Sequence, residues 1–343
     1  MKLSQKDVYK WTEYTFTNDN GMSVSVLNFG GIITKLNVPN RDGLHENIVV
    51  GYKNYEDFEK DPNYFGAIIG RVAGRIQGSS FQINDKTYSL EANNGANHLH
   101  GGSEGFHQVI WNVEPFQTSD TIGLTLSHKS LDGEGGYPGN VDLLITYTLS
   151  NDNQLTLDYQ AESDQTTPLT LTNHAYFNLN GNLKETVDNH QITLDSSHFV
   201  ELDSHLIPTG NILPVEDTTF DFRASRPLVD GFNDTFEQNK IAGSGYDHYF
   251  VFDHNMENQA SIYEPTSGRV MTIKTNQPGM VMYTGNSMGQ ENELAEGPSQ
   301  KHLGVCFETQ GSPASLHHNI LPSIMLTAKH PYKKQTVFTF FTK

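Results

Sequence analysis

Apolar and polar residues alternate one by one through much of the chain, the pattern of a strand buried on one face. Three separate segments carry it, with apolar residues at Met22, Val24 and Val26, at Ile122, Leu124 and Leu126, and at Leu155, Leu157 and Tyr159. Further β-branched or aromatic runs lie at 141–149, 262–263, 269–275, 280–283 and 336–341. No amphipathic segment reaches twelve residues, and 55–60 is expected to form one or two helical turns before Pro62. The pattern predicts an all-β protein.

Turn signals separate these segments at short intervals, as expected for antiparallel strands in a sandwich or barrel. They are Asn20-Gly21, Asp42-Gly43, Asp132-Gly133, Pro138-Gly139 and Asn180-Gly181. No Pro/Ser-rich linker divides the 343 residues, so a single domain over 1–343 is expected. The longer polar stretches 223–244 and 286–300 are expected to be loops at the rim, where binding groups usually lie.

The net charge and the cysteine content limit which partners the protein can bind and in which cellular compartment it is expected. Lys plus Arg number 22 and Asp plus Glu 40, so the formal charge of -18 disfavours nucleic acids and anionic membranes as partners. No apolar run approaches the ~20 residues that span a bilayer. The single cysteine, Cys306, forms no intramolecular disulfide and no Cys-rich zinc cluster, which is typical of a reducing compartment. With no signal-like apolar segment in residues 1–19, a soluble, cytoplasmic protein is expected.

Two polar clusters in the first third of the chain carry possible binding groups. Arg71 and Arg75 lie among small residues in 70–76, where an arginine fork suits hydroxyl or carboxylate oxygens, although surface arginines in a tight turn would look the same. His98 and His100 would face one side of an extended segment, as two metal ligands do. Because the sequence names no third ligand, a hydrogen-bonding pair is favoured over a metal site.

A third cluster surrounds His174. If residues 169–177 form a strand, one face carries Leu169, Leu171, Ala175 and Phe177. The other face carries Thr170, Thr172, His174 and Tyr176. His174 would then be either a satisfied core residue or a proton donor and acceptor near neutral pH.

The fourth cluster surrounds Glu308, which would share one face of a strand with Gly304, Cys306 and Gln310. A carboxylate in an apolar strand is either compensated or functional, and burial would raise its pKa and suit it to act as a base. A structural salt bridge to Arg71 or Arg75 is the alternative. Asp247 adds a carboxylate directly before an aromatic strand. No Gly-rich phosphate loop and no Gly-x-Ser-x-Gly elbow is present, so nucleotide binding and serine-hydrolase chemistry are unsupported.

Taken together, the segments resemble the aldose 1-epimerase (galactose mutarotase) family. The matching pieces, in family order from about Asn20 onward, are Gly70-Arg71-x-x-x-Arg75-Ile76, Leu99-His100-Gly101-Gly102, the segment 132–139, Asn173-His174-x-Tyr176-Phe177-Asn178-Leu179, Ile207-Pro208-Thr209-Gly210, Tyr246-Asp247-His248 and Phe307-Glu308-Thr309-Gln310. Each piece is short, but seven in order across nearly the whole chain make a specific match. The resemblance implies one large antiparallel β-sandwich, in agreement with the alternation.

The resemblance also implies an activity and the residues that perform it. It makes Glu308 the general base and His174 the general acid in opening and closing the ring of a hexose such as D-galactose or D-glucose, without cofactor or metal. Arg75, His100 and Asp247 would hold the sugar, and Tyr176 would line its face. An ionised Glu308 with a protonated His174 predicts a bell-shaped pH profile.

Two departures from the family pattern bear on sugar preference. Gly74 stands where many members have Asn, and Val281 where some have Gln, so two contacts to sugar hydroxyls are in question. Two other functions stay open. A glycoside hydrolase would use a carboxylate pair such as Asp247 and Glu308. A non-catalytic sugar-binding or sugar-sensing protein would keep the fold, although binding alone would not require an acid facing a base.

Overall fold

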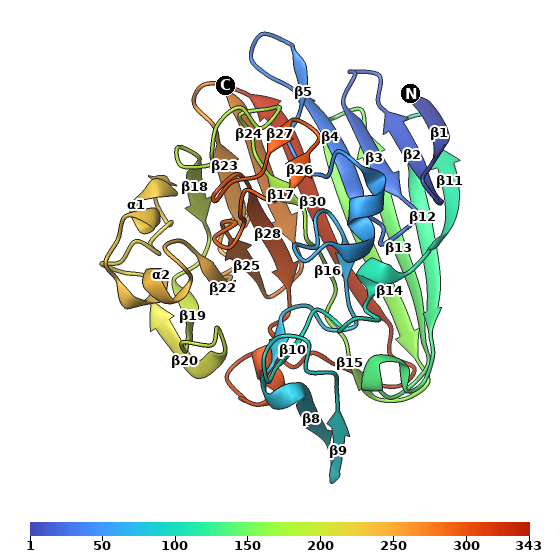
Figure 1. Ribbon diagram of the computed structural model, residues 1–343, viewed down its shortest axis with the longest axis vertical. Helices are drawn as coiled ribbons and strands as arrows, with labels where there is room; N and C mark the ends of the chain where they lie inside the picture. Colours follow the sequence, from blue (N-terminus) through green and yellow to red (C-terminus); the bar gives the residue numbers. More distant parts are fainter.

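The computed structural model describes residues 1–343 and consists mainly of antiparallel strands (Figure 1). The largest sheet has nine strands, in the order β11 (Asn112–Gln117), β12 (Thr121–Ser130), β13 (Val141–Ser150), β14 (Gln154–Ser163), β30 (Tyr332–Thr342), β24 (Arg269–Thr275), β23 (Ala260–Tyr263), β18 (Gln191–Leu194) and β21 (Arg226–Pro227). Its C-terminal strand β30 pairs with β14 on one side and with β24 on the other. The sheet is therefore assembled from strands far apart in the sequence.

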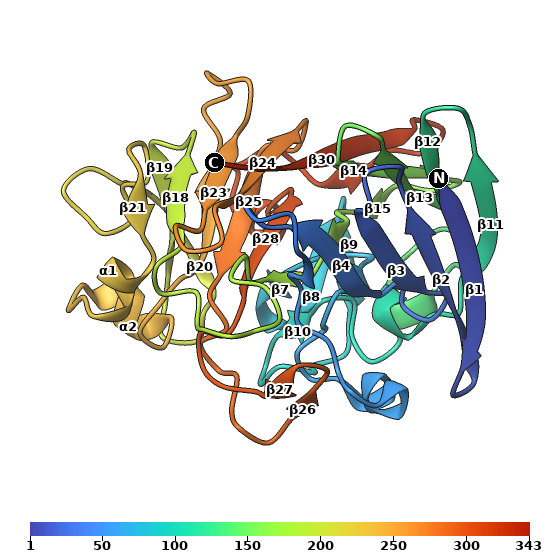
Figure 2. The ribbon, with the colours of Figure 1, turned by 90° about the horizontal axis from the view of Figure 1, so that it is seen from above.

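Two further sheets form the opposite layer. The six-stranded sheet has the order β17 (Tyr176–Phe177), β28 (Val305–Gln310), β25 (Gly279–Tyr283), β22 (Asp247–Val251), β19 (His198–Leu202) and β20 (Pro208–Pro214). The five-stranded sheet contains β1 (Lys2–Val8), β2 (Trp11–Thr17), β3 (Ser23–Leu27), β4 (Ile33–Pro39) and β5 (His45–Asn47). Figure 2 shows β30, β14 and β24 along one side of the molecule and β2 to β4, β25 and β28 facing them.

Short paired strands and helical turns complete the fold. The pairs are β6 (Ile68–Ile69) with β16 (Thr172–Asn173), β7 (Arg75–Ile76) with β10 (His98–Leu99), β8 (Ser80–Ile83) with β9 (Lys86–Ser89), β15 (Thr167–Pro168) with β29 (Met325–Leu326), and β26 (Glu293–Leu294) with β27 (Gly297–Pro298). Helices α1 (Val229–Phe232) and α2 (Glu237–Ile241) lie beside β19 and β20 in Figure 1. Five 3-10 turns are Tyr55–Lys60, Gln77–Ser79, Phe106–Gln108, Glu134–Gly136 and Pro313–Leu316.

The main hydrophobic core lies between the layers, because every sheet turns one set of alternating residues inward. It joins Val24 of β3, Leu124 of β12, Leu157 of β14, Met282 of β25 and Phe307 of β28, all at most 2% exposed. The all-β sandwich predicted from the alternation is confirmed, and the apolar positions that carried the prediction are buried. None of the helices has the length and apolar character required to cross a bilayer.

The predicted turns and loops differ in how well they match. All five turn glycines named above have φ between 79° and 86°, the left-handed region that glycine adopts without strain. The helical turns expected at 55–60 are present as a 3-10 helix. The stretch 223–244, expected to be a loop, instead contains α1 and α2. These helices span only four and five residues, too short for their sequence pattern to distinguish them from a polar loop.

Candidate active site

The floor of the site is one face of the six-stranded sheet. In the register, Glu308 of β28 lies opposite Val281 of β25, and Tyr283 of β25 lies opposite both Cys306 of β28 and Asp247 of β22. Because side chains alternate between the faces of a sheet, these residues point away from the core, and Phe307 and Met282 point into it. The alternation that fills the core thus also presents Glu308 and Asp247 on the same side.

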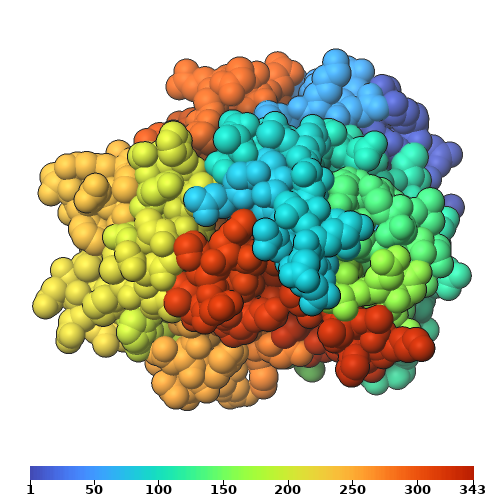
Figure 3. All heavy atoms as spheres, turned by 90° about the horizontal axis from the view of Figure 1, so that it is seen from below, coloured from blue at the N-terminus to red at the C-terminus, as the bar shows by residue number.

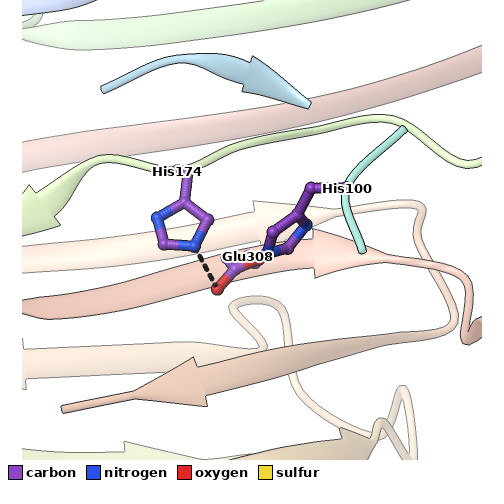
Figure 4. Close-up of side chains that lie close together, drawn as sticks. All are labelled: His100, His174 and Glu308. Atoms are coloured by element: carbon purple, nitrogen blue, oxygen red, sulfur yellow. Dashed lines mark ion pairs between the residues drawn. The ribbon is translucent and has the colours of Figure 1, made fainter. Parts of the chain in front are cut away.

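Glu308 and His174 meet at the centre of this floor (Figure 4). His174 Nε2 lies 3.4 Å from Glu308 Oε1, and the two residues are 4% and 3% exposed. Burial raises the pKa of Glu308 well above its ordinary value, and the nearby Asp247 raises it further. Burial lowers the pKa of His174 to about 4, because the charged imidazolium is disfavoured away from water. Both shifts favour the neutral forms, a carboxylic acid beside an imidazole.

The backbone of His174 is bonded on both sides to the loop that follows Asp61. The Gly66 N–H donates to the carbonyl oxygen of His174 over 3.1 Å, and the His174 N–H donates to the carbonyl oxygen of Ala67 over 2.9 Å. At the side chain, Nδ1 lies 3.5 Å from the sulfur of the buried Cys306. The imidazole is therefore positioned by a loop, a strand and a neighbouring side chain.

His100 approaches the pair from β10 and its following turn. Its Nδ1 accepts a hydrogen bond from the backbone N–H of Gly74 over 3.1 Å, so in the neutral ring Nε2 carries the proton. The ring lies 5.2 Å from that of His174 at an interplanar angle of 90°. Burial and the neighbouring His174 and Arg75 keep the pKa of His100 well below its ordinary value. The His100 ring therefore presents a neutral Nε2–H donor.

Arg75 and Asp247 form the second polar pair. Arg75 Nη1 lies 3.4 Å from Asp247 Oδ2, and Arg75 Nε donates to the side-chain oxygen of Asn94 over 3.2 Å. Burial raises the pKa of Asp247, and the facing guanidinium opposes this by favouring the carboxylate. The guanidinium keeps further N–H donors, so the pair offers both donors and acceptors to a polyhydroxylated ligand.

One group of side chains in the site has the composition of a metal site. Ligand atoms of His100, His174 and Glu308 all lie within 4.8 Å of one another. The group fits a metal poorly, however, because the Gly74 N–H fixes the proton of His100 on Nε2. Binding a cation at Nε2 would move that proton to Nδ1, against the Gly74 N–H. The arrangement suits proton transfer and hydrogen bonding better.

Two of the sequence expectations need correction. Arg71 does not join Arg75: its guanidinium is buried and donates to Ser130 Oγ and to two backbone carbonyl oxygens, of Leu131 and Pro138. His98 does not stand beside His100, since the chain leaves the extended conformation at His100, where φ is 55°. The His98 ring instead lies against Tyr137.

The alternative of a structural salt bridge at Glu308 is wrong, since no ion pair joins Glu308 to Arg71 or Arg75. The expected division of faces around His174 is confirmed, with Leu171 and Phe177 in the main core and Tyr176 outside it. The segment is not one strand, because only Thr172–Asn173 and Tyr176–Phe177 are paired. Tyr176 lines the pocket, but its hydroxyl is already committed to the carbonyl oxygen of Asn63 at 3.0 Å.

Sequence reasoning missed Tyr64, which packs against His100 and His174 of the site and against the neighbouring His107. Its ring centroid lies 4.8 Å from that of His100, 4.8 Å from that of His107 and 5.8 Å from that of His174. Tyr64 has a φ of 58°, rare for a residue with a side chain. Nothing in the local sequence marks this conformation. The only available signal was the turn chemistry of Asp61-Pro62-Asn63 just before it.

These residues surround one cavity of about 390 Å³. Its lining includes the polar residues Glu308, His174, His100, Arg75 and Asp247 and the apolar residues Leu202, Leu206, Pro208, Ile241 and Ala242. Figure 3 shows the cyan, yellow and red parts of the chain meeting on the face seen from below. The cavity, referred to below as the pocket, is therefore built from segments that are distant in sequence.

Known proteins agree with this architecture. The family model described as aldose 1-epimerase matches residues 12–339. Galactose mutarotase of Sus scrofa is 37% identical over 322 residues, 93% of this chain and 91% of the relative. Maltose epimerase of Levilactobacillus brevis is 31% identical over 342 residues, 99% of this chain and 97% of the relative. The crystal structure of galactose 1-epimerase from Lactobacillus acidophilus NCFM superposes with a TM-score of 0.87 at 29% identity, covering 99% of this chain and 98% of that one.

The family match spans nearly the entire chain and includes every strand that forms the floor of the site. The chain belongs to the aldose 1-epimerase family.

Proposed function

We propose that Glu308 and His174 are the general base and general acid by which this enzyme interconverts the α and β anomers of a free aldose. Membership of the family makes the protein an isomerase of sugar anomers. The observation that carries the assignment of roles is the buried contact of 3.4 Å between His174 Nε2 and Glu308 Oε1, beside a cavity of about 390 Å³.

The reaction needs one proton removed and one supplied on the same face of the sugar. Glu308 takes the proton of the O1 hydroxyl while His174 gives a proton to the ring oxygen O5. The C1–O5 bond breaks as the C1=O1 bond forms, which leaves the open aldehyde. Rotation about C1–C2 presents the other face of the carbonyl. The O5 hydroxyl then attacks C1, His174 takes back its proton, and Glu308 returns the proton to O1. Atoms and protons balance, and the enzyme ends as it began.

The opposite pKa shifts of the two groups match this cycle. The pair shares one titratable proton in two arrangements. In the first, Glu308 is a carboxylate and His174 an imidazolium; in the second, Glu308 is a carboxylic acid and His174 is neutral. The second arrangement is the one left after ring opening, and it is the form that burial favours. The charged pair from which ring opening starts is therefore the costlier arrangement, in the free enzyme as well as with sugar bound, and ring opening relieves that cost.

The remaining polar residues would hold the sugar hydroxyls. Arg75 supplies N–H donors, Asp247 an acceptor and His100 a fixed Nε2–H donor, and Tyr176 contributes a ring face. Hexoses such as D-galactose and D-glucose are the proposed substrates, and galactose is the sugar in the name of the Sus scrofa relative.

The two departures lie beside these contacts. At Gly74, where φ is 88°, a Cβ would stand 2.9 Å from Cγ of Pro313, so a side chain there would displace the proline. Val281 is half-buried and lines the pocket with an apolar surface. Neither departure replaces Glu308 or His174, and both bear on the hydroxyl contacts and so on which aldose is preferred.

The two other functions have less support. A hydrolase acting through Asp247 and Glu308 would need both carboxylates free for the glycosidic bond, but Asp247 is paired with Arg75. A sugar sensor would have no use for an acid and a base in contact at its centre. The cytoplasmic location and the absence of nucleic-acid partners stay predictions.

Polarimetry on freshly dissolved α-D-galactose and α-D-glucose tests the proposal. The enzyme should accelerate relaxation to an unchanged end point. Glu308→Gln and His174→Asn should each reduce kcat by ~10²–10⁴-fold, the usual contribution of a general acid or base. Thermal melting of both variants should stay near that of the parent protein. A variant that melts normally and retains the parental kcat would refute the role of the residue replaced.

A further inference from the structure

We propose that a second cavity, separate from the pocket, binds a phosphate group, either as the free ion or as part of a small metabolite. This second cavity measures about 520 Å³ and shares no lining residue with the pocket. Its lining includes Gln277, Tyr332, Lys333 and Lys334. None of these residues takes part in the proposed function, so the two proposals stand or fall separately.

The charge of the lining is opposite to that of the chain. The chain has 40 Asp and Glu against 22 Lys and Arg, yet no Asp or Glu lines the second cavity. Two lysines and two histidines do, namely Lys333, Lys334, His254 and His330. Elsewhere in the chain, six lysines form ion pairs with carboxylates: Lys6, Lys10, Lys53, Lys129, Lys184 and Lys274. Lys333 and Lys334 belong to none of these pairs, so their charge is available to an anion that enters the cavity.

The ammonium group of Lys334 is satisfied only in part. The side chain is half-buried, and Nζ donates to the backbone carbonyl oxygen of Asn276 over 3.3 Å, which uses one of its three protons. Burial lowers the pKa of Lys334, because the charged form is disfavoured away from water. A bound anion would supply the opposite charge that the protein leaves out.

The hydroxyl of Tyr332 adds a donor that has no acceptor. Its oxygen accepts from the backbone N–H of Leu171 over 3.2 Å and from Nε2 of Gln277 over 3.3 Å, but the O–H itself donates to no protein group. Gln277 is 1% exposed, so the hydroxyl is held from within the protein. Lys334 lies two residues further along β30, on the same face of the strand. The strand thus presents a fixed O–H donor and an ammonium group together, and lysine is a common ligand of phosphate oxygens.

Rigid and apolar residues complete the second cavity. Three prolines line it, and their rings fix φ near −65°: Pro278, Pro322 and Pro331. Leu169, Ile324 and Leu326 add an apolar part and are at most 7% exposed. Sites for small organic ligands measure about 300–1,000 Å³, and the second cavity falls in this range. A phosphate carried by a small metabolite therefore fits the cavity better than the free ion does.

Isothermal titration calorimetry of the full chain tests the site. The probes are α-D-glucose 1-phosphate and inorganic phosphate, and methyl α-D-glucoside is the uncharged control. At least one phosphate should bind saturably, and saturating D-galactose should leave its Kd unchanged, because the two cavities share no lining residue. Tighter binding of glucose 1-phosphate would identify a metabolite as the ligand, and equal or tighter binding of inorganic phosphate would identify the free ion; both results support a phosphate site.

Three lysine variants locate the bound phosphate. Lys334→Gln keeps a polar donor but removes the charge, and it should raise Kd by about tenfold, the usual effect of losing a charged hydrogen bond. Lys333→Gln should raise Kd several-fold. Lys329→Gln is the matched control, because Lys329 is an exposed lysine close in sequence that does not line the second cavity. It should leave Kd unchanged, and all three variants should melt at the temperature of the parent protein.

Four results would overturn the proposal. The first is the absence of saturable binding for both phosphates, and the second is binding that D-galactose abolishes, since the ligand would then occupy the pocket. The third is a Kd that Lys334→Gln leaves unchanged, or that Lys329→Gln raises as much, which would show attraction to surface charge alone. The fourth is binding of methyl α-D-glucoside with the Kd of glucose 1-phosphate, which would show that the phosphate is not recognised.

Discussion

At the scale of single residues, the site depends on proton positions, and these make the pH dependence testable. Below a pH of about 4, the pKa of His174, the pair holds two protons and Glu308 lacks a base form. Above the raised pKa of Glu308, the pair loses its last proton and no acid remains. We therefore expect kcat to pass through a bell-shaped maximum, measured by polarimetry after subtraction of the spontaneous rate. A rate that keeps rising on the alkaline side would contradict a one-proton pair.

Tyr64 gives a second prediction at this scale. Tyr64→Phe keeps the ring over His100 and His174, so only contacts of the hydroxyl to the sugar are lost, and KM should rise several-fold with kcat nearly constant. Tyr64→Ala uncovers the two histidines to water and should lower kcat by about tenfold, because water weakens the electrostatics of the site. Steady-state kinetics on D-galactose separates the two effects. Equal kcat and KM for the parent protein, Tyr64→Phe and Tyr64→Ala would show that Tyr64 has no role in the site.

The position of a site residue could be predicted from the sequence only where its backbone is a regular strand. Glu308 lies in a regular strand, so its face followed from alternation with Phe307. His100 and Tyr64 lie where the chain turns with positive φ, at 55° and 58°. In such conformations the alternation of faces no longer applies, so the pairing of His98 with His100 was wrong and Tyr64 was missed. The sugar-binding roles of His100 and Asp247 came from the resemblance to the family rather than from spacing.

At the scale of elements, the loop from Asp61 to Ala67 connects a buried carboxylate to His174, the proposed general acid. Asp61 accepts from the hydroxyl of Tyr52 over 2.7 Å and from the N–H groups of Asn63 and Phe65 over 2.8 and 2.5 Å. The next two residues, Gly66 and Ala67, form hydrogen bonds with the backbone of His174. The loop is thus fixed at one end by a side chain and at the other by the site itself.

Asp61→Asn tests this coupling. The amide nitrogen of Asn cannot accept, so one of the backbone N–H groups loses its partner, which costs about 1–3 kcal/mol for a buried group. We expect the urea midpoint to fall accordingly and kcat to drop, since His174 is no longer held on both sides. Asp57→Asn, on the neighbouring 3-10 helix, is the control, because the Asp57 carboxylate accepts only an exposed hydrogen bond from the side chain of Asn54. Loss of stability with an unchanged kcat would show that the loop does not position His174.

Among the elements, long strands were predictable and short ones were not. The segments 141–149 and 269–275 appear as β13 and β24 because their periodicity extends over seven or more residues. The pairs β7 with β10 and β6 with β16 contain two residues per strand, too few for a period, yet they position Arg75 and support the segment before His174. The helix α2 is held by Gln238 rather than by an amphipathic pattern, so tertiary bonds decide its existence.

At the scale of the whole molecule, we propose that residues 1–343 unfold as one domain. The core joins residues of all three large sheets, and β30 links β14 to β24. A single calorimetric transition is expected, with equal calorimetric and van't Hoff enthalpies. Two resolved transitions would contradict the proposal.

Buried histidines predict lower stability in acid. Burial lowers the pKa of His107, His174 and His190 to about 4 and that of His248 to about 3. Between their ordinary pKa of ~6.5 and these values, the unfolded chain binds protons that the folded chain does not, so stability falls as pH drops, by on the order of 1–2 kcal/mol per histidine at pH 5. Asp61 and Glu308, with raised pKa values, act in the opposite sense.

Urea unfolding at pH 7 and pH 5 checks this expectation. The midpoint should be lower at pH 5, and the difference should shrink in His190→Gln, which replaces a buried histidine outside the pocket with a group that does not titrate. Equal midpoints at the two pH values in the parent protein would show that these histidines do not govern the acid response.

The position of β30 has a consequence for synthesis. Its partners β14 and β24 are separated from it by about 170 and 60 residues, and neither is complete as a sheet strand until residues 332–342 insert between them. Until the ribosome has made β30, the two halves of the nine-stranded sheet each present an unpaired edge to other chains. A nonsense mutation shortly before Tyr332 would therefore preserve Glu308, His174 and the rest of the pocket and yet release a chain prone to aggregate.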